Sequence, residues 1–142
     1  MFNPSRDQVR QFFCATWQKF EAQQPLMGAE IAAAAIISQH PEYHALLRQT
    51  ETALQQNWTP AQGTMNPFLH LSLHLAVQEQ VDIDQPYGIR LVHEQLLQRM
   101  DKHSADHVLL ESLGETIWAA QHTGNTMDSA AYLEIVRKKA SR

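Results

Sequence analysis

Residues 66–81, NPFLHLSLHLAVQEQV, constrain the fold more than any other stretch of the sequence. Asn66 is a favourable N-cap, and Pro67 suits the first helical position, where its missing N–H would have no partner anyway. At about 100° per residue, apolar side chains fall on nearly every side of this helix. Such a helix lies inside a bundle, because a helix at the edge keeps a polar face for solvent. The sequence therefore predicts a central buried helix over 66–82.

Helical periodicity recurs along most of the 142-residue chain, and no segment sustains the two-residue alternation of a strand. Capping residues and Pro or Gly breakers divide the pattern into about six to seven helices. No shift in composition marks a second domain, and the length suits one hydrophobic core. We therefore predict an all-α fold, a single compact helical bundle around helix 66–82, with residues 1–142 as one helical domain.

The first helix has two candidate starts. Ser5 with Gln8 three residues later matches a capping box, whereas Asn3 with Pro4 would start the helix slightly earlier. Aromatic residues recur at spacings of three and four through about Ala22. This spacing indicates an aromatic face that packs into the core.

Other local signals decide which histidines share a helix. Pro41 belongs at a first helical position, so His40 becomes a cap or lies outside the helix. The expected N-caps of the last two helices are Ser104 and Asp128. With a cap at Ser104, His103 precedes the helix and is separated from His107.

The charge balance excludes broad classes of protein. The 11 basic and 15 acidic residues give a formal net charge of −4, which argues against a general nucleic-acid binder. Helix 66–82 is too short and too polar to span a membrane. The single cysteine, Cys14, cannot form an internal disulfide, which fits a reducing compartment. The first residues show no export signal, so we expect a cytoplasmic protein.

His70 and His74 are the strongest candidate metal ligands. They stand four residues apart on helix 66–82, so their side chains lie on the same side. Two helical imidazoles at this spacing can share one metal ion, and His44 is a candidate third ligand. The alternative is structural, with each ring bonded to a carboxylate or carbonyl of a neighbouring helix, because an unsatisfied buried nitrogen costs about 1–3 kcal/mol.

A second group of candidate ligands lies on the long helix near the C-terminus. His107, Glu111 and Glu115 advance four residues at a time along one side of this helix. If they face His70 and His74, they complete a mononuclear or dinuclear metal site of the kind found inside helical bundles. The alternative is a solvated stripe, because the leucines of the same helix point nearly the opposite way.

Five segments carry a resemblance to a known family. They are FNPSRDQVRQFF, HPEYH, NPFLHLSLHLAVQEQ, DIDQPYGIR and LGETIW, and together they span nearly the whole chain. In these segments the chain resembles a family of small bacterial proteins that is catalogued only as a domain of unknown function. The resemblance implies a bacterial, cytoplasmic setting and no particular activity.

Two functional hypotheses follow. In the first, the chain is a non-catalytic interaction or accessory protein, whose buried His/Glu cluster holds the fold together and whose surface binds an unknown protein partner. In the second, the residues His70, His74, His107, Glu111 and Glu115 bind zinc, iron or manganese. An open coordination position would then activate water or oxygen in a hydrolase or a redox enzyme. Both hypotheses leave the substrate and the oligomeric state open.

Overall fold

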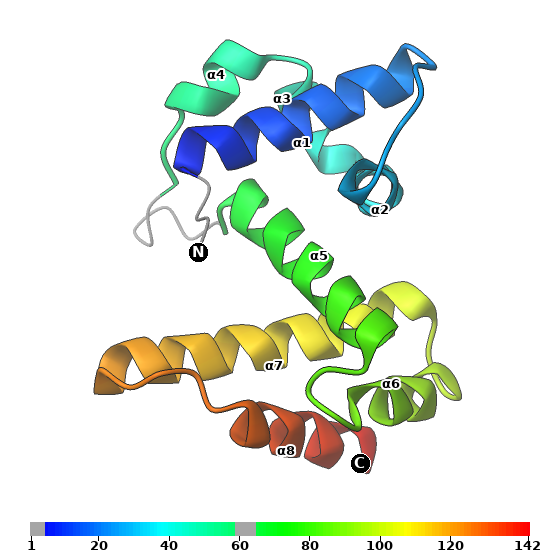
Figure 1. The fold of residues 1–142 in the computed structure, drawn as a ribbon, viewed down its shortest axis with the longest axis vertical. Helices are drawn as coiled ribbons and strands as arrows, with labels where there is room; N and C mark the ends of the chain where they lie inside the picture. The colour runs from blue at the N-terminus through cyan, green and yellow to red at the C-terminus, as the bar shows by residue number, and fades with distance from the viewer. Residues whose placement is uncertain (1–4, 59–64) are drawn as a thin grey trace. The chain divides into compact units, whose positions relative to one another are not determined.

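The computed structural model describes residues 5–58 and 65–142 of the chain (Figure 1). These residues form eight α-helices and one 3₁₀ helix, and they include no β-strand. None of the described helices is long and apolar enough to cross a lipid bilayer. The predicted all-α fold is confirmed. Two compact units divide the chain, Met1–Ser72 and Leu73–Arg142, and the expectation of one domain over 1–142 stays a prediction.

The first unit holds most of the short helices. They are α1 (Arg6–Glu21), α2 (Ala29–Ser38), the 3₁₀ helix η1 (Pro41–Tyr43), α3 (His44–Leu47) and α4 (Thr50–Gln55). A capping box starts α1: the Ser5 hydroxyl accepts from the N–H of Gln8 at 3.1 Å, and the Gln8 side chain accepts from the N–H of Ser5 at 2.8 Å. The predicted start at Ser5 is confirmed, and the alternative at Asn3 lies outside the described residues. Helix α1 packs against α2, α3 and α4 (Figure 1).

The aromatic face of α1 supplies the core of the first unit. Phe13 and Trp17 are 2% and 4% exposed, and Cys14 between them is fully buried. Each large apolar side chain buried in this way contributes about 1.5–3 kcal/mol. Phe13 packs against Phe68 with ring centroids 6.4 Å apart. The predicted burial of this face is confirmed.

Helix α5 (Pro67–Ile83) is the helix predicted over 66–82. The side-chain oxygen of Asn66 accepts hydrogen bonds from the N–H groups of Phe68 at 2.9 Å and Leu69 at 3.4 Å, so the expected N-cap forms. The cap and Pro67 together set the register of every later residue in the helix.

Both units include part of α5. Residues up to Ser72 belong to the first unit, and residues from Leu73 belong to the second. Phe68 is 3% exposed and His74 is 4% exposed, whereas Leu69 is 51% exposed and lines a surface cavity. The helix is therefore less uniformly buried than its apolar composition predicts.

The second unit contains the rest of α5 and the helices α6 (Ile89–Leu97), α7 (Lys102–Thr123) and α8 (Ser129–Ala140). Helices α6, α7 and α8 pack pairwise around one core (Figure 1). Its fully buried large side chains include Ile89, Leu96, Leu109, Tyr132 and Val136. Asp128 caps α8 as predicted, because its carboxylate accepts from the N–H of Ala130 at 3.0 Å.

The start of α7 differs from the prediction. Asp101 caps this helix, and its carboxylate accepts from the hydroxyl of Ser104 at 2.6 Å and from the N–H of Ser104 at 3.4 Å. Aspartate and serine are comparable caps, so local preference alone does not choose between the two positions. The earlier start places His103 inside α7, one turn before His107. The predicted separation of these two histidines is therefore wrong.

Candidate metal centre

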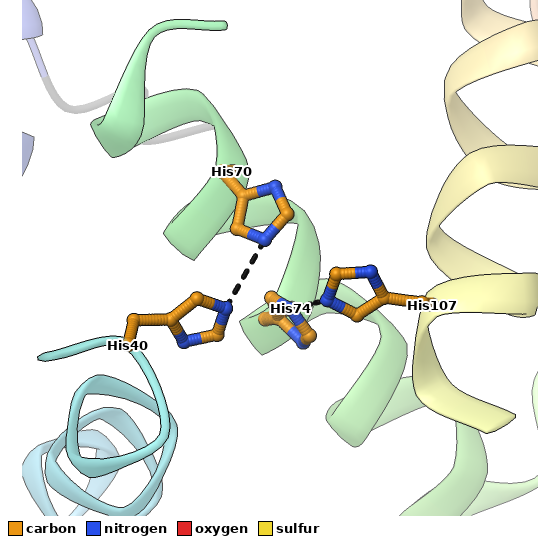
Figure 2. A group of neighbouring side chains, drawn as sticks. All are labelled: His40, His70, His74 and His107. Carbon is orange, nitrogen blue, oxygen red and sulfur yellow. Dashed lines mark hydrogen bonds between the residues drawn. The ribbon is translucent and has the colours of Figure 1, made fainter. Parts of the chain in front are cut away.

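Helix α5 fixes two of the candidate histidines relative to each other. His70 and His74 lie one turn apart on this helix (Figure 2). The Cβ atoms of residues at this spacing are about 5–6 Å apart on one face. Each of the two rings has a histidine partner within its own unit. His70 contacts His40 in the first unit, and His74 contacts His107 in the second.

In the first unit, the Nε2 atoms of His40 and His70 lie 3.2 Å apart. His40 follows α2 and is 3% exposed, and its Nδ1 lies 2.8 Å from the carbonyl oxygen of Ile36. Because a carbonyl oxygen only accepts hydrogen bonds, Nδ1 carries the proton. In the neutral ring, Nε2 therefore presents its lone pair toward His70. The His40 ring also lies parallel to the Tyr43 ring, with centroids 5.5 Å apart.

In the second unit, the Nε2 atoms of His74 and His107 lie 3.1 Å apart. His103 packs beside this pair, with its ring centroid 4.4 Å from that of His107 and 5.6 Å from that of His74. Helix α7 thus places the imidazoles of His103 and His107 next to the buried ring of His74.

The histidines of these two pairs, His40 with His70 in the first unit and His74 with His107 in the second, are the described residues that could hold a metal ion (Figure 2). Two nitrogens bound to one tetrahedral zinc ion at about 2.0–2.1 Å lie about 3.3–3.4 Å apart. The separations of 3.2 and 3.1 Å within the two pairs are close to this edge length. The same separations suit an N–H···N hydrogen bond between neutral rings, so the arrangement also satisfies the rings without metal.

Three of the five predicted ligands, namely His70, His74 and His107, belong to these two pairs. Glu111 and Glu115 are exposed on α7, and Glu115 pairs with Lys139 at 3.2 Å. Helical geometry explains the difference. Each four-residue step rises about 6 Å and rotates the side chain by about 40°, so Glu115 lies about 12 Å and 80° away from His107.

His44, the other candidate ligand of the sequence analysis, has partners inside the first unit. Its Nε2 lies 2.8 Å from the carbonyl oxygen of Ile37. Its ring stacks on Trp17 with centroids 4.2 Å apart. His44 therefore links α3 to α2 and to the aromatic face of α1. The candidate ligand that sequence reasoning missed is His40, whose contact with His70 joins residues 30 positions apart.

A different buried histidine pairs with a carboxylate. His93 of α6 is 5% exposed, and its Nε2 lies 2.8 Å from Oδ1 of Asp106. Lys102 contacts the other carboxylate oxygen at 2.7 Å. Burial alone would raise the pKa of Asp106, but the hydrogen bonds from His93 and Lys102 hold this pKa below its usual value. His93 is thus satisfied inside the protein core.

Comparison with known proteins places the chain in a family. A family model with the description "Domain of unknown function (DUF1841)" matches residues 5–138. The chain belongs to this family. The match confirms the resemblance to a family of unknown function, and it covers residues of both compact units. No curated protein and no solved structure matches the chain.

Proposed function

We propose that this chain binds one divalent transition metal ion through ring nitrogens of His40, His70, His74 and His107. The observation that carries the proposal is the pair of Nε2–Nε2 separations, 3.2 Å for His40 with His70 and 3.1 Å for His74 with His107. Helix α5 carries one member of each pair on successive turns, so the two pairs serve the same ion. A set of four imidazoles is a stronger ligand set than either pair alone.

The ligand chemistry narrows the choice of metal. Neutral imidazoles suit zinc, copper and nickel as well as iron, whereas magnesium and calcium prefer oxygen ligands. Manganese also favours carboxylates, and the exposure of Glu111 and Glu115 weakens the case for it. Zinc fits best, because it accepts four nitrogen ligands in a tetrahedral arrangement.

The number of ligands favours a structural role for the metal. Structural zinc sites are closed by four protein ligands, whereas catalytic sites keep one position for water or substrate. A closed site agrees with the interpretation of the chain as a non-catalytic accessory protein. The binding free energy of the ion then adds to the free energy of folding, because the unfolded chain offers no preformed site.

The surroundings of His40 support this assignment. Metal-bound histidines almost always donate their second ring N–H to a carbonyl or a carboxylate, which fixes the tautomer and the ring orientation. The Nδ1 atom of His40 makes such a contact with Ile36 at 2.8 Å. The ring is therefore oriented before any ion binds.

The test is the metal content of the untagged chain. The protein is stripped with EDTA, equilibrated with excess zinc and separated from free metal by gel filtration. We expect about one zinc ion per chain in the wild type and none in the His70→Ala/His74→Ala variant. The matched control, His44→Gln/His122→Gln, removes two imidazoles outside the group and should retain the zinc.

Two results would contradict the proposal. One is a wild-type chain that takes up no zinc and, when equilibrated in the same way with iron, copper or nickel, none of these metals either. The other is a His70→Ala/His74→Ala variant that retains as much metal as the wild type. Circular dichroism of each variant separates loss of the site from loss of the helical fold.

A further inference from the structure

The first unit contains a cavity of about 390 Å³, formed by the first turns of α1, the segment after α4 and the start of α5. The side chains that give it chemical character are Arg6, Arg10, Asn57, Trp58, Phe68 and Leu69. Among the described residues that line it, two carry guanidinium groups and none carries a carboxylate. Small-molecule sites in proteins occupy about 300–1,000 Å³, so the cavity suits a compact ligand.

Arg10 is a buried cation held by neutral groups. The residue is 3% exposed, and its Nη1 donates to the carbonyl oxygens of Ala53 and Gln56, each at 2.7 Å. Its guanidinium carbon lies 5.1 Å from the ring centroid of Trp58 and 5.2 Å from that of Phe68. These contacts orient the guanidinium in advance, so a ligand loses little side-chain entropy by binding to it.

Arg6 adds a second cation one helical turn before Arg10. Its Nη2 lies 3.2 Å from the carbonyl oxygen of Gln56 and 3.3 Å from the side-chain oxygen of Asn57. Its carboxylate neighbour, Asp7, lies 3.7 Å away, and both side chains of this pair are exposed. Burial and then the charge of Arg6 lower the pKa of Arg10. Two like charges therefore lie close together beside the cavity.

A structural role explains part of this arrangement. Helix α4 ends at Gln55, and Arg10 donates to carbonyl oxygens at this end, where a cation complements the helix dipole. Within the described parts of the chain, however, every hydrogen bond of this guanidinium leaves from Nη1. The donors on Nε and Nη2 are not needed for the cap. Arg6 shares the cap through the carbonyl oxygen of Gln56, but capping does not explain the ring of Trp58 or the placement of both cations beside the cavity.

We propose that this cavity binds a small organic anion in which a phosphate or a carboxylate is joined to a planar unsaturated ring. The oxyanion pairs with Arg6 and Arg10, because the guanidinium fork matches the geometry of both phosphate and carboxylate oxygens. The ring packs against Trp58 and Leu69, which give the cavity an apolar side. A bare inorganic anion would leave that apolar side uncovered. This site is separate from the proposed metal ligands and rests on its own observations.

Isothermal titration calorimetry with benzoate, AMP and inorganic phosphate tests the proposal. Benzoate joins a ring to a carboxylate, AMP joins a ring system to a phosphate, and inorganic phosphate has no ring. We expect at least one of the two ring-bearing anions to bind about tenfold or more tightly than inorganic phosphate. Binding of AMP alone identifies a nucleotide-like ligand, and binding of benzoate alone identifies an aromatic carboxylate.

Three variants locate the binding. Arg6→Gln removes an exposed cation and is expected to weaken binding by about tenfold or more. Arg48→Gln is the matched control, because Arg48 pairs with Glu21 in the same unit and does not line the cavity. It should bind like the wild type. Trp58→Leu keeps apolar volume but removes the stacking face, so it should weaken binding of the ring-bearing anion.

Two outcomes would overturn the proposal. One is that none of the three anions binds with a dissociation constant below about 1 mM. The other is that a ring-bearing anion binds equally well to the wild type and to Arg6→Gln. The titrations are made with EDTA-treated and with zinc-loaded chain, so that failure of the metal site does not affect the result.

Discussion

Two histidines of the second unit are equally buried but meet different partners. His93 is 5% exposed and contacts the carboxylate of Asp106 at 2.8 Å, whereas His74 is 4% exposed and contacts the ring of His107 at 3.1 Å. Protonation of His93 strengthens the first contact, because it creates an ion pair. Protonation of both rings weakens the second contact, because it places two like charges side by side.

The two buried histidines therefore have different chemical roles in the protein. A carboxylate partner satisfies a buried imidazole without any further ligand. An imidazole partner places a second neutral ring nitrogen beside the first. Neutral ring nitrogens are ligands that transition metals bind, and two of them can bind one ion. The pair of His40 and His70 in the first unit repeats this second arrangement at 3.2 Å. The nature of the partner, rather than the burial, identifies the candidate ligands.

The largest expected effect is on zinc affinity, which should fall in a His74 variant and change little in a His93 variant. Loss of an outer-shell partner alone costs about 10–100-fold in metal affinity, so loss of a ligand in His74→Ala should cost more than about 100-fold. His93→Ala should change the affinity by less than about threefold, because this residue does not touch the metal. Competition with a chromophoric zinc chelator measures both values. An equal loss of zinc affinity in His74→Ala and His93→Ala would contradict this distinction between the two histidines.

The second prediction concerns the stability of the metal-free protein, where His93 rather than His74 is expected to matter. His93→Ala leaves the buried carboxylate of Asp106 with Lys102 as its remaining partner, and we expect a loss of about 2–3 kcal/mol in the free energy of unfolding. His93→Gln retains a hydrogen-bond donor and should lose less. Urea denaturation in EDTA gives these values. A metal-free His93→Ala protein as stable as the wild type would show that the carboxylate pair contributes little.

The third prediction concerns pH. An imidazole must be neutral to bind metal, so lowering the pH from about 7.5 to about 5.5 should weaken zinc binding by about tenfold or more. The pKa of Asp106 is held below its usual value of about 3.9. The stability that this carboxylate contributes is present above that value and is lost only as the pH falls through the lowered pKa. The pair with His93 therefore persists at the pH where zinc is released.

Zinc retention and urea denaturation at both pH values check this difference. Zinc that stays bound with unchanged affinity at about pH 5.5 would argue against imidazole ligands. A loss of metal-free stability over the same interval, abolished in His93→Ala, would instead place the sensitive group at the carboxylate pair.

The smallest effect is expected on the exposed stripe of α7. Glu111→Gln/Glu115→Gln should leave zinc affinity unchanged within about twofold, because neither carboxylate belongs to the four-histidine group. The partly exposed ion pair of Glu115 with Lys139 contributes about 0–1 kcal/mol. A large loss of zinc affinity in this variant would restore the two glutamates as ligands and change the expected metal.

Local rules predicted the part of the candidate site that lies on one helix. Asn66 and Pro67 fix the start of α5, and the four-residue spacing of His70 and His74 follows directly from that register. The capping box at Ser5 was equally readable from the sequence, because both of its partners are close in the chain.

The rest of the candidate site depends on contacts that local rules do not encode. His40 lies outside a helix, and its ring meets His70 only through tertiary packing. His103 was assigned to the wrong side of a helix start, because Asp101 and Ser104 are both good caps. Spacing alone did not show that Glu111 and Glu115 are exposed, because each step of four residues rotates the side chain by about 40° around the helix axis.

X-ray absorption at the zinc K-edge of the zinc-loaded, untagged chain tests the central claim most directly. We predict a first shell of about four nitrogen scatterers at about 2.0–2.1 Å, with the outer-shell signals of imidazole rings. A shell with two or fewer imidazoles, or a shell of about six oxygen atoms, would contradict the assignment of the four histidines as the metal site.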